Sequence, residues 1–183
     1  MTALLALESN KMDNLVEAKE EILKMYGTSI YLSLHEKMKL RDLVYGLMLR
    51  SGNDAALAIA SYVGGNVDEF VKKMNEKAVA LGMKHTQFKN CTGLDDNIES
   101  GHFSSAYDVA LMSRELITKH PEISNYSTVW MDTIIHKTKK GETEFGLTNT
   151  NKLVRFYDGI TGLKTGSTSK AKYCLSASAR RDD

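Results

Sequence analysis

Hydrophobic residues recur at helical spacing through much of the chain. The clearest stripe consists of Leu40, Leu43, Val44, Leu47 and Met48, which share one helix face because they follow the i, i+3, i+4, i+7 pattern. We interpret this stripe as core packing. Helices are also expected over residues 1–8, 19–25, 55–63, 66–82 and 106–118, and a brief helical turn is expected from residue 121.

The pattern changes towards the C-terminal end, where β-branched, hydroxyl and small residues replace the helical periodicity. Residues 130–135 and 143–147 flank Lys139-Lys140-Gly141, which predicts a β-hairpin. Residues 160–165 and 173–179 predict a second strand pair, with glycine and serine turn signals between the strands. A short strand is also expected at Ser29–Leu32.

These elements predict an α+β fold in which a helical region packs on an antiparallel sheet. The helical region is expected at about residues 1–128, the hairpin at about 129–148 and the sheet strands at about 158–181. A chain of 183 residues is long enough to bury one core. No repeat, linker or low-complexity segment divides it, so we expect a single domain.

The composition narrows the classes of partner. Lys plus Arg total 24 and Asp plus Glu total 23, which gives a net charge of +1 and no electrostatic argument for nucleic acid or an anionic membrane. No run of 18 apolar residues is present, so no transmembrane segment is expected. Met1–Leu7 is apolar but lacks the basic start and the cleavage site of a signal peptide.

The cysteines and histidines indicate neither a disulfide framework nor a metal centre. Cys91 and Cys174 match no metal-ligand spacing, and we expect both to be buried or half-buried small apolar residues rather than a bridge or a nucleophile. The five histidines are scattered without carboxylate or cysteine clusters around them. No metal and no cofactor is therefore expected.

Two short motifs carry the chemistry. Lys164-Thr165-Gly166 places a cation beside a hydroxyl and a residue without a side chain, so a substrate carboxylate can dock there. Ser51-Gly52-Asn53 lies in a break between two expected helices and offers a hydroxyl proton relay next to an amide. Taken singly, the first motif also fits a solvated turn, and Ser51 and Asn53 also fit helix caps.

Taken together, the motifs resemble the penicillin-binding protein and serine β-lactamase superfamily. More narrowly, the chain is similar to the serine-type D-alanyl-D-alanine carboxypeptidases, the low-molecular-weight penicillin-binding proteins. The stretches that carry this resemblance are 1–8, 50–56, 74–78, 81–83, 90–94, 101–108, 149–153 and 158–174. Several ordered stretches at family-like separations form a much more specific signal than either motif alone.

The resemblance implies a role for each site residue. Ser51 would relay a proton to the leaving amine, Asn53 would bind the substrate's amide, and Lys164 would complete the catalytic group. The substrate-binding residues would be Thr165 and Gly166 with Ser167 and Thr168. Lys164 and Thr165 would hold the terminal carboxylate, and the Ser167 N–H would supply half of an oxyanion hole.

The family's S-x-x-K nucleophile motif has no convincing counterpart. Ser167 with Lys170 and Ser169 with Lys172 match its spacing, but both pairs follow a predicted strand, where residues i and i+3 point to opposite faces. We expect that the chain begins just after the catalytic lysine, that N-terminal strands and a last strand of the sheet are missing, and that the chain alone is inactive.

The implied activity is removal of the terminal D-Ala from peptidoglycan stem peptides through a serine acyl-enzyme, outside the cytoplasmic membrane. Peptidoglycan stem peptides and inhibitory β-lactams are then the expected partners. Three alternatives stay open: a β-lactamase or esterase relative, a catalytically dead peptidoglycan-binding module, and the non-functional product of an internal start in a damaged gene.

Overall fold

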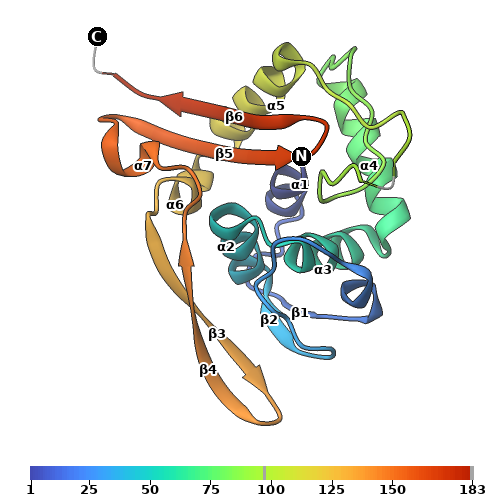
Figure 1. Ribbon diagram of the computed structural model, residues 1–183, viewed down its shortest axis with the longest axis vertical. Coiled ribbons are helices and arrows are strands. Elements are labelled where there is room, and N and C mark those ends of the chain that lie inside the picture. Colours follow the sequence, from blue (N-terminus) through green and yellow to red (C-terminus); the bar gives the residue numbers. More distant parts are fainter. Residues whose placement is uncertain (97, 182–183) are drawn as a thin grey trace.

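A computed structural model describes residues 1–96 and 98–181, and it has the α+β architecture expected from the sequence. Helices α1, α2 and α3 lie together at the centre, and the hairpins extend from this body (Figure 1). The helices are α1 (Thr2–Glu8), the 3₁₀ helix η1 (Glu20–Lys24), α2 (Leu40–Arg50), α3 (Asn53–Gly64), α4 (Val67–Ala80), α5 (Ala106–Lys119), the 3₁₀ helix η2 (Pro121–Ile123), α6 (Ser124–Ser127) and α7 (Leu153–Phe156).

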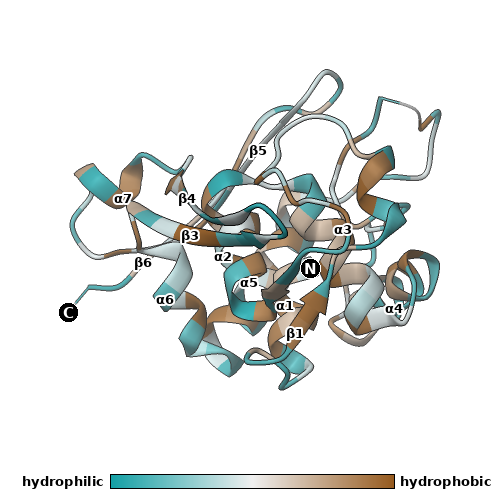
Figure 2. Ribbon diagram, turned by 90° about the horizontal axis from the view of Figure 1, so that it is seen from below, coloured by the Kyte–Doolittle hydropathy of each residue, from teal (hydrophilic) through white to brown (hydrophobic). Residues whose placement is uncertain are grey.

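The core forms where the apolar faces of the central helices meet. Leu40, Leu43, Val44 and Met48 of α2 are buried, as the hydrophobic stripe predicts. Leu47 is the exception, because it is only half-buried and lines a pocket instead. Viewed from below, hydrophilic residues gather on loops and helix ends, while the centre of α3 is largely hydrophobic (Figure 2).

Side-chain caps fix where two of the helices begin. Asn66 accepts a hydrogen bond from Glu69 N at 2.8 Å and starts α4, and Ser105 accepts one from Asp108 N at 3.1 Å and starts α5. Each cap satisfies an N–H that has no partner inside the helix. The sequence-based expectations for both starts are therefore confirmed.

The strands form three separate two-stranded antiparallel sheets. The predicted hairpin is confirmed as β3 (Met131–Thr138) with β4 (Gly141–Thr148), and the second predicted pair as β5 (Ile160–Thr168) with β6 (Lys172–Ala179). The third sheet, β1 (Leu15–Glu17) with β2 (Lys37–Lys39), was not predicted, because each strand is only three residues long.

A buried polar contact joins the β3–β4 hairpin to the body. His136 Nδ1 lies 2.8 Å from Glu36 Oε1, and both residues are buried. The other Glu36 oxygen accepts from Ser33 N at 2.9 Å. The edge of Phe145 packs near His136 with ring centroids 5.7 Å apart. A hydrogen-bonded pair and an aromatic contact therefore hold the hairpin where it leaves the core.

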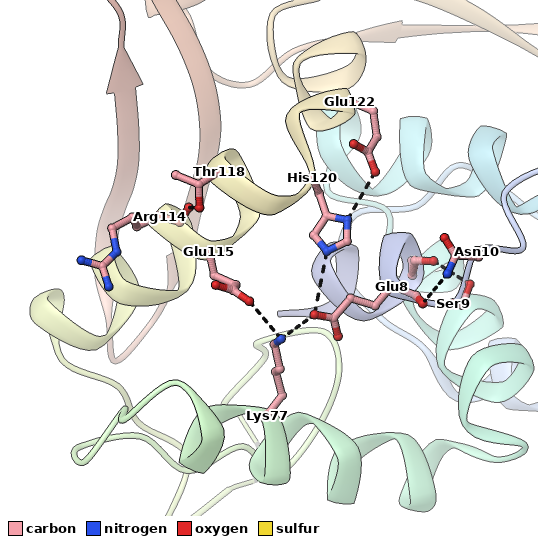
Figure 3. Close-up of polar contacts among 10 residues, drawn as sticks. Glu8, Ser9, Asn10, Lys77, Arg114, Glu115, Thr118, His120 and Glu122 are labelled. Carbon is pink, nitrogen blue, oxygen red and sulfur yellow. Dashed lines mark hydrogen bonds and ion pairs between the residues drawn. The ribbon is translucent and has the colours of Figure 1, made fainter.

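A network of charged residues joins α1, α4 and α5 on the side of the molecule shown in Figure 3. Lys77 Nζ lies 2.5 Å from Glu8 Oε1 and 3.3 Å from Glu115 Oε1, and all three side chains are largely buried. His120 bridges Glu8 and Glu122 at 3.9 and 3.3 Å. Partial burial makes these pairs stronger than exposed ones, so the network fixes the helix packing.

Four local expectations were wrong or incomplete. Ser29–Leu32 is not a strand, and the expected helix at 19–25 is the shorter η1. The short helix α7 was not among the expected elements. Cys91 is buried as expected, but Cys174 is exposed on β6, and neither forms a disulfide. Within residues 1–96 and 98–181, no helix is long and apolar enough to cross a membrane.

We predict that Phe70→Ala destabilises the fold strongly. Phe70 on α4 is fully buried, so its removal loses transfer free energy and leaves a cavity, and the free energy of unfolding should fall by about 3–5 kcal/mol. Val79 on the same helix is 80% exposed, and Val79→Ala should change stability by less than about 0.5 kcal/mol. Urea unfolding of both variants tests this, and similar losses would contradict the assigned core.

Candidate active site

All the site residues expected from the sequence line one pocket of about 810 Å³. The pocket lies between the α2–α3 junction, the loop at 92–94, the segment at 150–153 and strands β5 and β6. The two motifs, more than 100 residues apart in the chain, therefore meet in the fold. The pocket residues expected from the sequence are Ser51, Asn53, Lys164, Thr165, Gly166, Ser167 and Thr168.

The α2–α3 junction turns sharply at Ser51. Its φ of 58° and ψ of 38° are left-handed, which ends α2 and lets the Gly52 N–H bond the Gly46 carbonyl at 3.1 Å. Asn53 then begins α3. Its backbone N–H donates to the Thr28 carbonyl at 2.8 Å, and its side-chain Nδ2 donates to the Tyr26 carbonyl at 2.9 Å. Neither Ser51 nor Asn53 caps a helix through its side chain.

The carboxylate of Asp54 holds this junction in place. It is buried and accepts four hydrogen bonds, from Ser29 Oγ at 2.6 Å, Ile30 N at 3.0 Å, Leu32 N at 2.9 Å and Ala55 N at 2.9 Å. These bonds fasten residues 29–32 to the start of α3. They also explain why that segment is not a strand, since its amides bind a side chain instead of a neighbouring backbone.

Lys164 carries the main electrostatic feature of the pocket. Its Nζ donates to Ser51 Oγ and, at 2.8 Å, to the Thr165 carbonyl oxygen. Burial lowers the pKa of Lys164 from 10.5 to about 8, because the charged ammonium loses hydration. The amine can therefore gain or lose a proton close to neutral pH, next to the Ser51 hydroxyl.

A second segment joins β5 on the other side of Lys164. Thr150 N donates to the Leu49 carbonyl at 3.1 Å, and Thr150 Oγ1 lies 2.5 Å from Thr165 Oγ1. Asn149 and Asn151 on either side are buried, and Asn149 Oδ1 accepts from Asn151 N at 2.9 Å. The two asparagines thus turn the backbone and place Thr150 between α2 and β5.

A loop closes the pocket near the end of β5. Asn90 Oδ1 accepts from Thr92 N and Gly93 N at 3.1 and 2.8 Å, which stiffens the turn that lines the pocket. Thr168 Oγ1 donates to Asp95 Oδ2 at 2.6 Å and accepts from Ala171 N at 2.9 Å. The Thr168 hydroxyl therefore fastens this loop to the β5–β6 turn.

The two S-x-x-K matches do not form serine–lysine contacts. Lys170 Nζ donates to the Ile98 carbonyl, and Ser169 Oγ donates to Asp96 Oδ1 at 3.3 Å. Lys172 begins β6 opposite Thr168. Within the described ranges, no group of three or more His, Cys, Asp or Glu residues is arranged to bind a metal ion.

Several residues that line the pocket or support its walls escaped prediction. Asp54 gave one weak signal, as a charged residue in an otherwise apolar helix, and Asp95 lay in a turn-rich loop without helical or strand periodicity. Arg50 and Lys152 line the pocket, yet each follows an ordinary sequence context. Lys152 belongs to the segment that the hydrogen bond from Thr150 N to the Leu49 carbonyl holds against α2, and no local pattern encodes that contact.

Solved structures of DD-peptidases have the same fold as this chain. A mutant of a Streptomyces DD-transpeptidase matches with a TM-score of 0.86 and 28% identity, covering 99% of this chain and 75% of the other. The D-alanyl-D-alanine carboxypeptidase of Mycobacterium tuberculosis matches with a TM-score of 0.86 and 28% identity, covering 99% and 66%.

Sequence comparison identifies the family. A family model described as peptidase S11, D-alanyl-D-alanine carboxypeptidase, matches residues 1–183, and the chain belongs to that family. The D-alanyl-D-alanine carboxypeptidase DacF of Bacillus subtilis is 44% identical over 186 residues. That alignment covers 99% of this chain but 46% of the relative, so the chain spans less than half the length of DacF. The expected family is confirmed.

We predict that the buried amine of Lys164 makes stability depend on pH. The folded pKa of about 8 lies below the unfolded value of 10.5, so the unfolded state binds more protons between these values and stability rises with pH across that window. Relative to the Lys164→Met variant, the free energy of unfolding of the wild-type chain should increase by about 2–3 kcal/mol between pH 7.5 and 10.5. Urea unfolding at several pH values measures the difference, and a constant difference would contradict the lowered pKa.

We also predict that Asp54→Ala releases residues 29–32 from the start of α3. The variant leaves the buried N–H of Ile30 without its partner, and the free energy of unfolding should fall by about 3 kcal/mol. Amide hydrogen exchange at residues 29–32 should accelerate more than exchange in α4. Asp158→Ala, at an exposed turn, serves as the control. Unchanged exchange at 29–32 would refute the role given to Asp54.

Proposed function

We propose that this chain forms part of a serine-type D-Ala-D-Ala carboxypeptidase, which removes the terminal D-Ala from peptidoglycan stem peptides outside the cytoplasmic membrane. The observation that carries the proposal is the contact of Lys164 Nζ with Ser51 Oγ in the pocket. Membership of the S11 family supports the same reaction. β-Lactams would acylate the complete enzyme, since the family resembles the penicillin-binding proteins.

The pocket offers a place for each part of the peptide. Thr165 would bind the terminal carboxylate with the positive charge of Lys164, and Gly166 leaves room for the ligand backbone. The N–H of Ser167 would stabilise the oxyanion. Asn53 Nδ2 already binds the Tyr26 carbonyl, which leaves Oδ1 to accept from a substrate N–H. Thr168 completes the wall beside the loop.

Proton transfer follows from the direction of one hydrogen bond. Because Lys164 Nζ donates to Ser51 Oγ, the Ser51 hydroxyl proton is free to be donated elsewhere. When a serine nucleophile gives its proton to its neighbouring lysine and bonds to the scissile carbonyl carbon, the C–N bond breaks and the leaving D-Ala amine takes the Ser51 proton. Lys164 can replace that proton, since its pKa is about 8. Water then releases the acyl group from the nucleophile.

The two S-x-x-K matches of this chain form no serine–lysine hydrogen bond among the described residues, so the activity is tested on the complete protein. The complete protein should therefore release D-Ala from a peptide ending in D-Ala-D-Ala, and Lys164→Ala should lower kcat/KM by about 10²-fold through loss of the proton source and the cation. Lys170→Ala removes an exposed lysine that does not line the pocket and is the control. A chromatographic D-Ala assay measures both variants.

Two outcomes would overturn the proposed function, and a third would overturn only the expected position of the nucleophile. Peptide binding without D-Ala release would indicate a catalytically dead binding module. Rapid turnover of penicillin without D-Ala release would indicate a β-lactamase. A covalent adduct between fluorescent penicillin and the 183-residue chain alone would show that the nucleophile lies within these residues.

A further inference from the structure

The turn between β5 and β6 is tied to the loop that connects α4 to α5, and Figure 1 shows the two side by side. Three successive residues of the turn donate side-chain hydrogen bonds to this loop: Thr168 Oγ1 to Asp95 Oδ2 at 2.6 Å, Ser169 Oγ to Asp96 Oδ1 at 3.3 Å, and Lys170 Nζ to the Ile98 carbonyl. The same loop supplies Thr92, Gly93 and Leu94 to one wall of the pocket, and β5 supplies another. These contacts therefore fix the distance between two walls of the pocket.

The contact of Thr168 with Asp95 is the strongest of the three. Asp95 is only 8% exposed, whereas Ser169 and Lys170 are exposed. A charged hydrogen bond is strong where water is excluded, and exposed ones contribute little. The second carboxylate oxygen of Asp95, Oδ1, is buried without a hydrogen-bond partner in the described part of the chain, which is unfavourable. The chain thus buries a carboxylate whose described hydrogen bond goes to the pocket wall.

The hydroxyl of Thr168 has no proton left for a ligand. It gives its only proton to Asp95, and it accepts from Ala171 N at 2.9 Å, which closes the turn. Thr168 lines the pocket, and the sequence predicted that it binds substrate. While it holds Asp95, however, it cannot donate to a substrate. Its contribution is then to fix the backbone at the end of β5, and that contribution depends on Asp95.

Two side-chain contacts hold the end of β5, one on each side of Ser167. Before it, Thr165 Oγ1 lies 2.5 Å from Thr150 Oγ1, and after it, Thr168 Oγ1 donates to Asp95. Ser167 is exposed in the pocket, and its N–H is the proposed oxyanion donor. A displacement of about 1 Å can lower a rate by about 10²-fold. Loosening the end of β5 would therefore slow the reaction without removing a group that binds the terminal carboxylate.

We propose that Asp95 is a positioning residue for the reaction. Through the Thr168 hydroxyl, its carboxylate holds the end of β5 against the loop that connects α4 to α5, and it keeps the Ser167 N–H where the oxyanion forms. This inference rests on the proposed function. Because Asp95 does not itself line the pocket, its effect should appear in kcat rather than in KM.

Release of D-Ala by the complete protein tests this role. Asp95→Ala should lower kcat about tenfold and change KM by less than about twofold, because Lys164 and Thr165 still bind the terminal carboxylate. Asp95→Asn keeps an oxygen that can accept from Thr168, so its kcat should stay within about threefold of wild type. Rates are expressed per folded molecule, with the folded fraction measured by circular dichroism at the assay temperature.

A double-mutant cycle separates positioning from general destabilisation. Thr168→Val should lower kcat about tenfold, as Asp95→Ala does, and combining the two changes should add less than about twofold, since both break the same hydrogen bond. Thr168→Val also carries the test if Asp95→Ala does not fold. Ser169→Ala removes the exposed contact with Asp96 in the same turn. It is the control, and its kcat should stay within about twofold of wild type.

Each other outcome has a distinct meaning. An unchanged kcat in Thr168→Val, or losses that multiply in the double variant, would overturn the role given to Asp95. A rise in KM at constant kcat would make Thr168 a binding residue and would overturn it as well. Equal losses in Asp95→Asn and Asp95→Ala would show that the hydrogen bond to Thr168 is not the cause. If the wild-type protein releases no D-Ala, the proposed function itself is refuted.

Discussion

The buried carboxylate of Asp54 is the interaction on which the site depends. Its four hydrogen bonds tie residues 29–32 to the first turn of α3, where a negative charge is also favoured by the helix dipole. The same contacts hold Ile30 against Gly46 and Gly52 at the α2–α3 junction. A Cβ on Gly46 or Gly52 would approach Ile30 to 2.8 or 3.1 Å. The glycines, the carboxylate and the left-handed Ser51 therefore act together to expose a serine at a helix break.

Strand β5 makes hydrogen bonds to this junction and to two other segments beside the pocket. Three of its side chains make hydrogen bonds to three separate segments: Lys164 to the end of α2, Thr165 to the segment at 149–152, and Thr168 to the loop at 90–96. Two of these bonds join residues 113 and 73 positions apart. Each is modest by itself, but together they set the width of the pocket, so its geometry depends on how β5 is seated.

Much of the fold follows from local patterns, because periodicity and capping act over a few residues. The α2 stripe and the starts of α4 and α5 were predictable for that reason. Ser29–Leu32 looked like a strand because its residues are β-formers, but the distant Asp54 takes its amides. Cys174 looked buried by residue type, yet it lies exposed on β6. The first error concerns a long-range contact and the second the exposure of a strand residue, and composition reveals neither.

The two motifs were predictable as a pair, whereas the surrounding cations were not. The Lys-Thr-Gly and Ser-Gly-Asn spacings belong to a family pattern, and the structure places both in one pocket. Arg50 and Lys152 have no pattern of their own. Arg50 lies at the end of α2 beside Ser51, and Lys152 follows the segment in which Thr150 N donates to the Leu49 carbonyl. Residue type alone would have placed Arg50 at the solvated surface, whereas it is half-buried; Lys152 is exposed, as its type suggests.

Packing of the fold does not explain why certain residues line the pocket. A Cβ on Gly166 would meet no atom within 4 Å, whereas one on Gly162 in the same strand would meet Ser127 at 2.5 Å. Packing thus explains Gly162 but not Gly166. Lys164 loses hydration where an apolar residue would not, and Arg50 keeps a buried donor without a described partner. Locally unfavourable choices that converge on one cavity are expected where a ligand compensates for them.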